Sequence, residues 1–102
     1  MSILVIDVGT SGLRAAVVRS DGTVAVDRHR PLLPSSPEAG LVEFDPAEMA
    51  RVALEVAAEV LAAGGPVEAV GIANQRASTI LWDRATGEPL GPGIGWQDLR
   101  TV

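Results

Sequence analysis

The sequence of 102 residues contains no cysteine, no lysine and no tyrosine, and it has a single histidine, His29. The absence of cysteine excludes a disulfide framework and a thiolate zinc site, and His29 has no second histidine with which to share a metal ion. We therefore expect His29 to be a solvated strand residue. Positive charge comes only from eight arginines scattered along a chain of net charge -5, so no basic stripe can follow a phosphate backbone. Nucleic acid is not an expected partner.

Long apolar runs are also absent, because no stretch reaches the roughly 18 residues of a membrane span. The N-terminus has neither a basic leader nor a small-residue cleavage site, so we expect a cytoplasmic protein without a membrane partner. With 47% hydrophobic and 21% charged residues, the composition is typical of one globular domain. A domain of this length buries only about two thirds of its surface on folding, so we expect marginal stability and exposed apolar surface that favours homo-oligomers.

The first third of the chain has the pattern of three antiparallel strands. A continuous apolar run at residues 3–8 predicts a strand that is buried on both faces, with Asp7 near its C-terminal end. Residues 13–19 and 23–30 predict two more strands, and the Asp-Gly pair between them is a hairpin signal.

A helix is predicted after the irregular loop at residues 31–40. Asp45 can cap the exposed amides, and Pro46 suits the first helical position. The helix should end near Ala63, because a Gly-Gly-Pro sequence follows. Apolar side chains at helical spacing predict one core-facing stripe: Met49, Val52, Ala53, Val56, Val60 and Leu61.

The remaining residues predict one more strand and a hairpin. Residues 67–73 should form a buried strand, which lies parallel to the strand at 3–8 because a helix connects the two. Asp7 and Asn74 would then meet at one rim of the sheet, where open α/β folds bind ligands. Residues 78–96 predict a hairpin with a Thr-Gly turn. The fold class is therefore α/β, in the order βββαβ followed by a hairpin.

The sequence DVGTSGLR, which begins at Asp7, has the composition of an anion-binding turn. Residues 9–12 can direct backbone amides and the hydroxyls of Thr10 and Ser11 at one anion, and Arg14 can supply positive charge. The turn differs from the GxxxxGK[ST] loop because it joins two antiparallel strands. A hairpin turn whose glycines serve backbone geometry alone fits the spacing as well.

Several motifs in order resemble the FGGY carbohydrate kinases, in particular their glycerol kinase branch. Beside the turn, these are residues 71–76 (GIANQR) and 96–101 (WQDLRT), with further similarity at residues 43–46 and 81–87. The resemblance implies a ribonuclease-H-like, actin-like ATPase fold in two domains. Residues 1–102 would be the N-terminal part of the first domain only, and the rest of the kinase would be their partner.

The resemblance also implies a nucleotide site that binds ATP and Mg²⁺. Asp7 matches an acidic residue near magnesium, and the general base is an aspartate outside this chain, so no catalytic residue is expected here and the chain alone should be inactive. Phosphoryl transfer depends on positioning and on neutralising charge, which amides, hydroxyls and an arginine can do. The expected cofactor-binding residues are Asp7, Gly9, Thr10, Ser11, Gly12 and Arg14.

The resemblance assigns an acceptor site to Arg76 and Trp96, which match an arginine that binds glycerol hydroxyls and a tryptophan that lines the carbon side. Without the resemblance, Arg76 would be a solvated charge and Trp96 a packing residue. Trp82 inherits no role and is expected to pack between the hairpin and the sheet. Glycerol kinases usually have glutamate where this chain has Ala77, so a different polyol or sugar is an alternative acceptor to glycerol.

Two other functions suit the same fold. A two-metal nuclease of the ribonuclease H type would need further carboxylates converging on Asp7. The corresponding strand end is Asn74, which is not acidic. A non-catalytic nucleotide- or anion-binding module, a degenerate relative of the kinases, stays open as the alternative.

Overall fold

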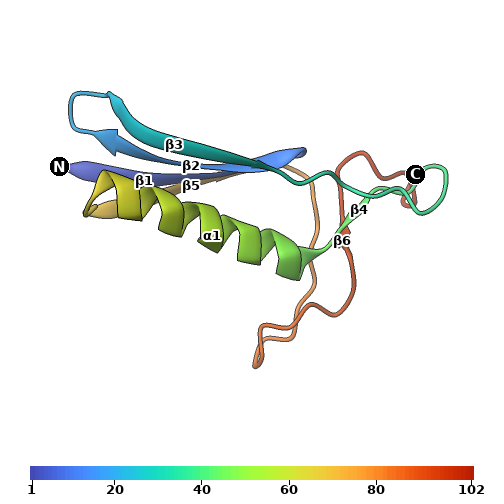
Figure 1. Cartoon of the computed structure of the whole chain (residues 1–102). Helices are drawn as coiled ribbons and strands as arrows, with labels where there is room; N and C mark the ends of the chain where they lie inside the picture. Colours follow the sequence, from blue (N-terminus) through green and yellow to red (C-terminus); the bar gives the residue numbers. More distant parts are fainter.

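Seven secondary-structure elements follow one another in the computed structural model, which describes residues 1–102: β1 (Ser2–Val8), β2 (Gly12–Arg19), β3 (Val24–Pro31), β4 (Glu43–Phe44), α1 (Pro46–Gly64), β5 (Ala69–Asn74) and β6 (Gly93–Ile94). Four strands form the main sheet in the order β3-β2-β1-β5, and β4 and β6 form a second sheet. The helix α1 lies along one face of the main sheet (Figure 1). The predicted order βββαβ is confirmed, whereas the short strand β4 was not predicted.

Strand pairing brings two strand ends to the same rim of the main sheet. β1 and β2 are antiparallel, with Asp7 opposite Arg14. β1 and β5 are parallel, with Val8 opposite Asn74. Asp7 and Asn74 therefore lie at the edge where both strands end, as the connection through a helix predicted.

The ends of α1 follow from local side-chain chemistry. The Asp45 carboxylate accepts hydrogen bonds from the amides of Ala47 and Glu48 at 2.9 and 3.3 Å, and Pro46 is the first helical residue. Such a cap typically contributes about 1 kcal/mol. At the other end Gly65 takes a positive φ of 83°, which glycine adopts without steric cost. No helix of the chain combines the length and the apolar character that crossing a membrane requires.

The core lies between α1 and the strands β1 and β2. All of its fully buried apolar side chains come from these elements: Leu4, Leu13, Ala15, Val17, Val52, Val56, Ala57 and Val60. Three of them belong to the predicted helical stripe, whose other members, Met49, Ala53 and Leu61, are partly buried against this core, whereas Ala57 was not predicted. The end of the helix approaches the sheet so closely that a Cβ atom on Gly64 would lie 2.8 Å from Val17 Cγ2. The prediction that one face of the helix forms the core is therefore confirmed.

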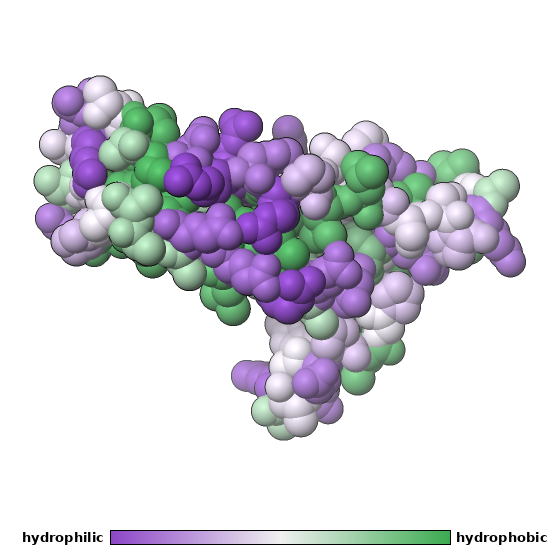
Figure 2. Space-filling model, viewed as in Figure 1, coloured by the Kyte–Doolittle hydropathy of each residue, from purple (hydrophilic) through white to green (hydrophobic).

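The strand β5 is exposed along its whole length, which contradicts the prediction of a buried strand at residues 67–73. Ile72 keeps 68% of its surface accessible. The prediction that residues 3–8 are buried on both faces is also wrong, since Leu4 alone is buried among them and Asp7 is exposed. The reason is that α1 packs chiefly against β2 and β3, while no second layer covers the opposite face. Green apolar surface remains visible between hydrophilic residues in Figure 2.

Residues 79–94 form an arm that projects away from the main sheet (Figure 1). The predicted hairpin is present, but isolated bridges join Thr79 to Ile94 and Trp82 to Pro89 in place of continuous strands, because prolines and glycines interrupt the ladder. Trp82 is 57% exposed, so the prediction that it packs against the sheet is wrong. The projecting arm raises the radius of gyration to 15.4 Å, compared with about 13 Å for a compact chain of this length.

Candidate functional site

The turn between β1 and β2, residues 9–12, is shaped by close backbone packing. The Gly9 amide donates a hydrogen bond to the Gly12 carbonyl at 2.9 Å and closes the turn. A Cβ atom on Gly12 would lie 2.6 Å from His29 Nε2 and 2.8 Å from the Arg30 carbonyl oxygen. A Cβ atom on Gly9 would lie 3.0 Å from the Gly12 carbonyl oxygen, so close backbone packing accounts for both glycines. Anion binding is compatible with this packing, because the same geometry presents the hydroxyl-bearing residues between the glycines.

Three polar side chains lie in a row beside the turn. Asp7 is opposite Arg14, and Arg14 is opposite His29, so one position on each of three neighbouring strands contributes to the row. All three are exposed on the face away from α1, because side chains alternate along a strand and Leu13 points to the core. No His, Cys, Asp or Glu joins Asp7 in a group of three or more that could hold a metal ion.

One hollow of about 350 Å³ is lined both by a residue of the turn and by the two predicted acceptor residues, Arg76 and Trp96. Thr10 lines it together with Gln75, Arg76, Ala77 and Trp96. The indole Nε1–H of Trp96 donates a hydrogen bond to Thr10 Oγ1 at 3.0 Å, although the two residues are 86 positions apart. The fold thus places a hydroxyl of the anion-binding turn, an exposed guanidinium and an aromatic ring around one small space.

Gln75 ties this hollow to the end of β1, and the sequence had given no reason to single it out. Its backbone amide donates to the Val8 carbonyl at 3.0 Å, which continues the pairing of β5 with β1. Its side chain donates to the Gly9 carbonyl at 3.4 Å and accepts from the Ser78 hydroxyl at 3.0 Å. Gln75 therefore fixes the start of the segment that presents Arg76 next to the turn.

Ala77 has a backbone conformation that is rare for its residue type. With φ of 61° it is the chain's only residue other than glycine with a positive φ. This left-handed conformation costs an alanine about 1–2 kcal/mol. Strained residues of this kind concentrate at functional sites, where the surrounding structure holds them in place. The strained conformation of Ala77 indicates that the fold holds the segment next to Arg76 in one position beside the hollow, at a cost in local stability.

The segment that carries Trp96 is anchored by a charged cluster next to β4. The Asp98 carboxylate accepts hydrogen bonds from Arg100 Nε and Nη2, both at 2.7 Å, and from the Val42 amide at 2.6 Å. Arg100 Nη2 also donates to Glu43 at 2.7 Å. Hydrogen bonding to Arg100 holds the pKa of Asp98 far below its usual range. Hydrogen bonding to Asp98, and then to Glu43, raises the pKa of Arg100.

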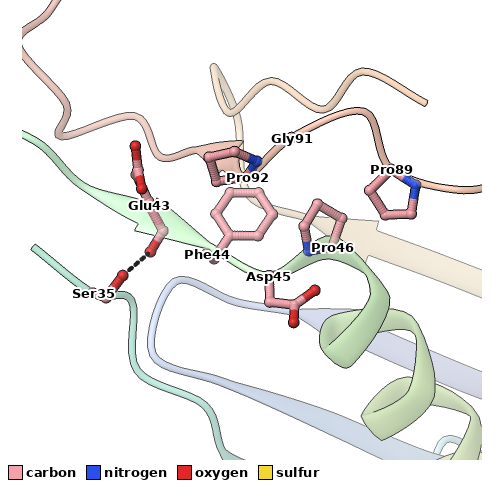
Figure 3. Close-up of a pocket in the computed structure, with 8 residues that line it drawn as sticks. All are labelled: Ser35, Glu43, Phe44, Asp45, Pro46, Pro89, Gly91 and Pro92. Carbon is pink, nitrogen blue, oxygen red and sulfur yellow. Dashed lines mark hydrogen bonds between the residues drawn. The ribbon is translucent and has the colours of Figure 1, made fainter. Parts of the chain in front are cut away.

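A second hollow, of about 340 Å³, lies between the start of α1 and the arm (Figure 3). Its polar side chains already have partners within the chain. Glu43 accepts from Arg100, and Asp45 accepts from the first amides of α1. Prolines and the ring of Phe44 supply much of the remaining wall. The first hollow, in contrast, also contains the exposed guanidinium of Arg76 and is therefore the better candidate for a functional site.

Comparison with known proteins identifies one family over nearly the whole chain. Residues 2–102 match the model of the N-terminal domain of the FGGY family of carbohydrate kinases. The glycerol kinase of Gloeobacter violaceus is 44% identical over 102 residues, which are 99% of this chain and 20% of that protein. The glycerol kinase of Trichlorobacter lovleyi is 44% identical over 104 residues, which are 98% of this chain and 21% of that protein.

Solved structures give the same result. A xylulose kinase from Rhodospirillum rubrum superimposes with a TM-score of 0.88 at 30% identity and covers 98% of this chain. Plasmodium falciparum glycerol kinase, solved with ADP, superimposes with a TM-score of 0.88 at 28% identity and covers 97% of this chain. In both cases the match spans 21% of the other protein. The chain therefore spans about a fifth of the length of the relatives that it matches.

Proposed function

Since this chain belongs to the FGGY family of carbohydrate kinases, we propose that it is the N-terminal part of the first domain of an ATP-dependent kinase that phosphorylates a hydroxyl group of a polyol or a sugar. The observation that carries the proposal is the hollow in which Thr10 of the anion-binding turn meets Arg76 and Trp96. A phosphate donor and a hydroxylated acceptor must lie within contact of each other for phosphoryl transfer. An arrangement that joins both kinds of binding group in one space is suited to that reaction.

The nucleotide side of the proposed site is the turn and the polar row beside it. Ser11 and Gly12 would present backbone amides to the phosphates, and the hydroxyls of Thr10 and Ser11 would donate hydrogen bonds to them. Gly9, whose amide closes the turn on the Gly12 carbonyl, would let the backbone approach the phosphates closely. Arg14, exposed on the neighbouring strand, would neutralise part of the charge on the transferred group.

Asp7 suits the magnesium ion that this chemistry requires. Its exposed side chain is a single carboxylate at the rim of the sheet. Magnesium in kinases typically takes one or two carboxylates, with phosphate oxygens and water as the other ligands. When bound, the ion would neutralise phosphate charge during transfer, and Asp7 would hold it near the turn.

Arg76 and Trp96 form the acceptor side of the proposed site. The guanidinium of Arg76 offers several donors for hydroxyl oxygens, and the indole face of Trp96 suits the carbon side of a polyol. Ala77 has no group that could accept a hydroxyl proton where the resemblance leads us to expect glutamate. The loss of such a charge-assisted hydrogen bond costs about 1.5–3 kcal/mol, or roughly tenfold to 150-fold in affinity. Acceptors other than glycerol therefore belong among the candidates.

The proposed reaction needs more protein than this chain supplies. No carboxylate lines the hollow, and we infer that the base that accepts the proton of the attacking hydroxyl comes from a part of the kinase outside this chain. The exposed face of β5, with Val70 at 56% and Ile72 at 68%, is a suitable contact for that part. We expect the chain alone to be inactive, and we expect the complete kinase in the cytoplasm, where ATP is available.

The test is ATP-dependent phosphorylation by the full-length protein with glycerol, xylulose, ribulose and gluconate as acceptors. Arg76→Ala should lower kcat/KM for the active acceptor by about tenfold to 150-fold, because charge-assisted hydrogen bonds are lost. Thr10→Ala should lower activity through the nucleotide side. Arg84→Ala is the matched control, because this arginine lies on the projecting arm outside the hollow.

One observation favours a second candidate function, a non-catalytic nucleotide- or anion-binding module. The residue at the hollow that should accept a hydroxyl proton is Ala77, which cannot. A degenerate module would bind magnesium and ATP in a calorimetric titration but would phosphorylate none of the four acceptors. Turnover on any of them, reduced by both site variants and not by Arg84→Ala, would exclude this candidate.

A further inference from the structure

The hydrogen bond between Trp96 and Thr10 determines which role the Thr10 hydroxyl has in this contact. The indole Nε1–H can only donate, so in this 3.0 Å contact Thr10 Oγ1 is the acceptor. A hydroxyl that accepts through one lone pair keeps its own proton for another partner. Because threonine is stiff about χ1, fixing its oxygen also fixes the rotamer. The proton of Thr10 is thereby reserved for an acceptor other than the indole.

We propose that Trp96 is a positioning residue for the anion-binding turn, acting through its indole N–H on the hydroxyl of Thr10. This role rests on the proposed function and is distinct from the contact of the indole face with the acceptor. The N–H orients Thr10 so that its hydroxyl donates to a phosphate oxygen of the nucleotide. One side chain thus links the acceptor side of the hollow to the phosphate side.

The surroundings of Trp96 explain why this hydrogen bond can set the position of the turn. The ring is 53% exposed, so core packing does not hold it. Its backbone, however, is anchored on both sides. The amide of Gly95 donates to the Val42 carbonyl at 2.9 Å, and Asp98 accepts from the Val42 amide at 2.6 Å. The anchored backbone therefore keeps the indole beside the turn, and its hydrogen bond to Thr10 sets the orientation of both side chains.

An acceptor molecule in the hollow would strengthen this link. Covering the exposed ring removes water from the hydrogen bond, and hydrogen bonds are electrostatically stronger where the local dielectric constant is lower. Nucleotide and acceptor should therefore each bind somewhat more tightly when the other is present. Such a coupling is reciprocal by thermodynamic necessity.

The experiment compares Trp96→Phe, Thr10→Val and the double variant in the full-length protein. Phenylalanine keeps an aromatic face and removes the N–H, whereas valine keeps the shape of threonine and removes the hydroxyl. Magnesium-ATP affinity is measured by calorimetry, and kcat and both KM values are measured by turnover. Trp96→Phe should weaken ATP binding or lower kcat by about 2- to 10-fold, the range for one hydrogen bond. The affinity for the acceptor alone, titrated without nucleotide, should change less than twofold, because phenylalanine keeps the aromatic face.

The double variant separates positioning from a structural role. If the N–H acts through Thr10, the double variant should match Thr10→Val within error, because its target is already gone. Multiplied effects of the two changes, or a Trp96→Phe protein that differs from wild type only in acceptor KM, would overturn the proposal. Trp82→Phe is the matched control and should leave every value unchanged, since that indole lies on the arm and is 57% exposed.

The binding data keep this inference separate from the proposed function. ATP binding that shows the predicted non-additivity, in a protein that phosphorylates no acceptor, would uphold the positioning role and refute the kinase. Normal turnover with additive variants would refute the positioning role alone. Failure of the wild-type protein to bind magnesium-ATP would refute both.

Discussion

Replacing Gly12 with alanine tests whether close packing fixes the anion-binding turn. The new Cβ atom would lie 2.6 Å from His29 Nε2, 3.1 Å from His29 Cε1 and 2.8 Å from the Arg30 carbonyl oxygen. The histidine ring is the far end of a flexible side chain and can rotate away at low cost. The Arg30 carbonyl belongs to the backbone of β3, which pairs with β2 at this point, so relief there requires the two strands to separate.

The size of the effect follows from two opposing contributions. Overpacking of this kind typically costs about 1–3 kcal/mol. Replacing glycine by alanine also restricts the unfolded chain, which returns about 0.4–1 kcal/mol where φ is compatible. Gly12 does not have a positive φ, so this second contribution applies. We expect a net loss of about 1–2 kcal/mol, which lowers the melting temperature of the chain by about 5–15 °C.

Thermal unfolding followed by circular dichroism measures this change. Gly71→Ala is the matched control, because its Cβ atom would meet nothing within 4 Å and its φ is not positive. That variant should melt at the wild-type temperature or slightly above it. Adding His29→Ala to Gly12→Ala should recover only part of the loss, since the Arg30 carbonyl stays in place. A Gly12→Ala protein as stable as Gly71→Ala would refute the packing argument.

Three further predictions concern other parts of the chain. Asp45→Ala should lower the free energy of unfolding by about 1 kcal/mol in urea titrations, because the amides at the start of α1 lose their acceptor; an unchanged midpoint would contradict this. Hydrogen bonding to Arg100 lowers the pKa of Asp98 in the folded state, so the stability from this pair is present above the unfolded pKa of about 3.9 and is lost as pH falls toward the folded pKa. Unfolding curves between pH 5 and pH 2 should therefore depend less on pH in Asp98→Asn than in wild type, and equal slopes would contradict the assignment. The exposed face of β5 should drive association of the isolated chain, and Ile72→Lys should reduce it in a light-scattering concentration series; a wild-type chain that stays monomeric throughout would exclude this.

The elements whose causes are local could be predicted from the sequence. The cap at Asp45, the apolar stripe of α1 and the Asp-Gly turn each depend on residues within a few positions of one another. The parallel pairing of β1 and β5 followed from the helix that connects them, because a crossover through a helix normally joins parallel strands of one sheet. These elements could therefore be predicted without knowledge of the tertiary structure.

Burial could not be predicted in the same way, because it depends on which layers surround a strand. The apolar residues of β5 have the composition of a buried strand, yet α1 extends over β2 and β3 and leaves Ile72 exposed. The short strand β4 and its pairing with β6 were likewise not predicted, since two-residue strands have no periodicity that could indicate them.

The candidate site was likewise predictable in its residue types but not in its long-range contacts. Residue types at the turn indicated an anion site, and the resemblance to FGGY kinases singled out Arg76 and Trp96. Neither could reveal the hydrogen bond between Trp96 and Thr10 or the role of Gln75 at the end of β1, because those contacts join distant parts of the chain. The positive φ of Ala77 also depends on the surrounding fold and has no signature in the sequence.

The most direct test of the proposed kinase is identification of the product. The full-length protein would be incubated with magnesium-ATP and each of the four acceptors, and phosphorus NMR would detect a phosphate ester on the acceptor. We expect one preferred acceptor whose phosphate ester forms in step with ADP, and ester formation that is about tenfold to 150-fold slower when Arg76→Ala is assayed at low acceptor concentration. ATP that is bound but never transferred to any acceptor hydroxyl would contradict it.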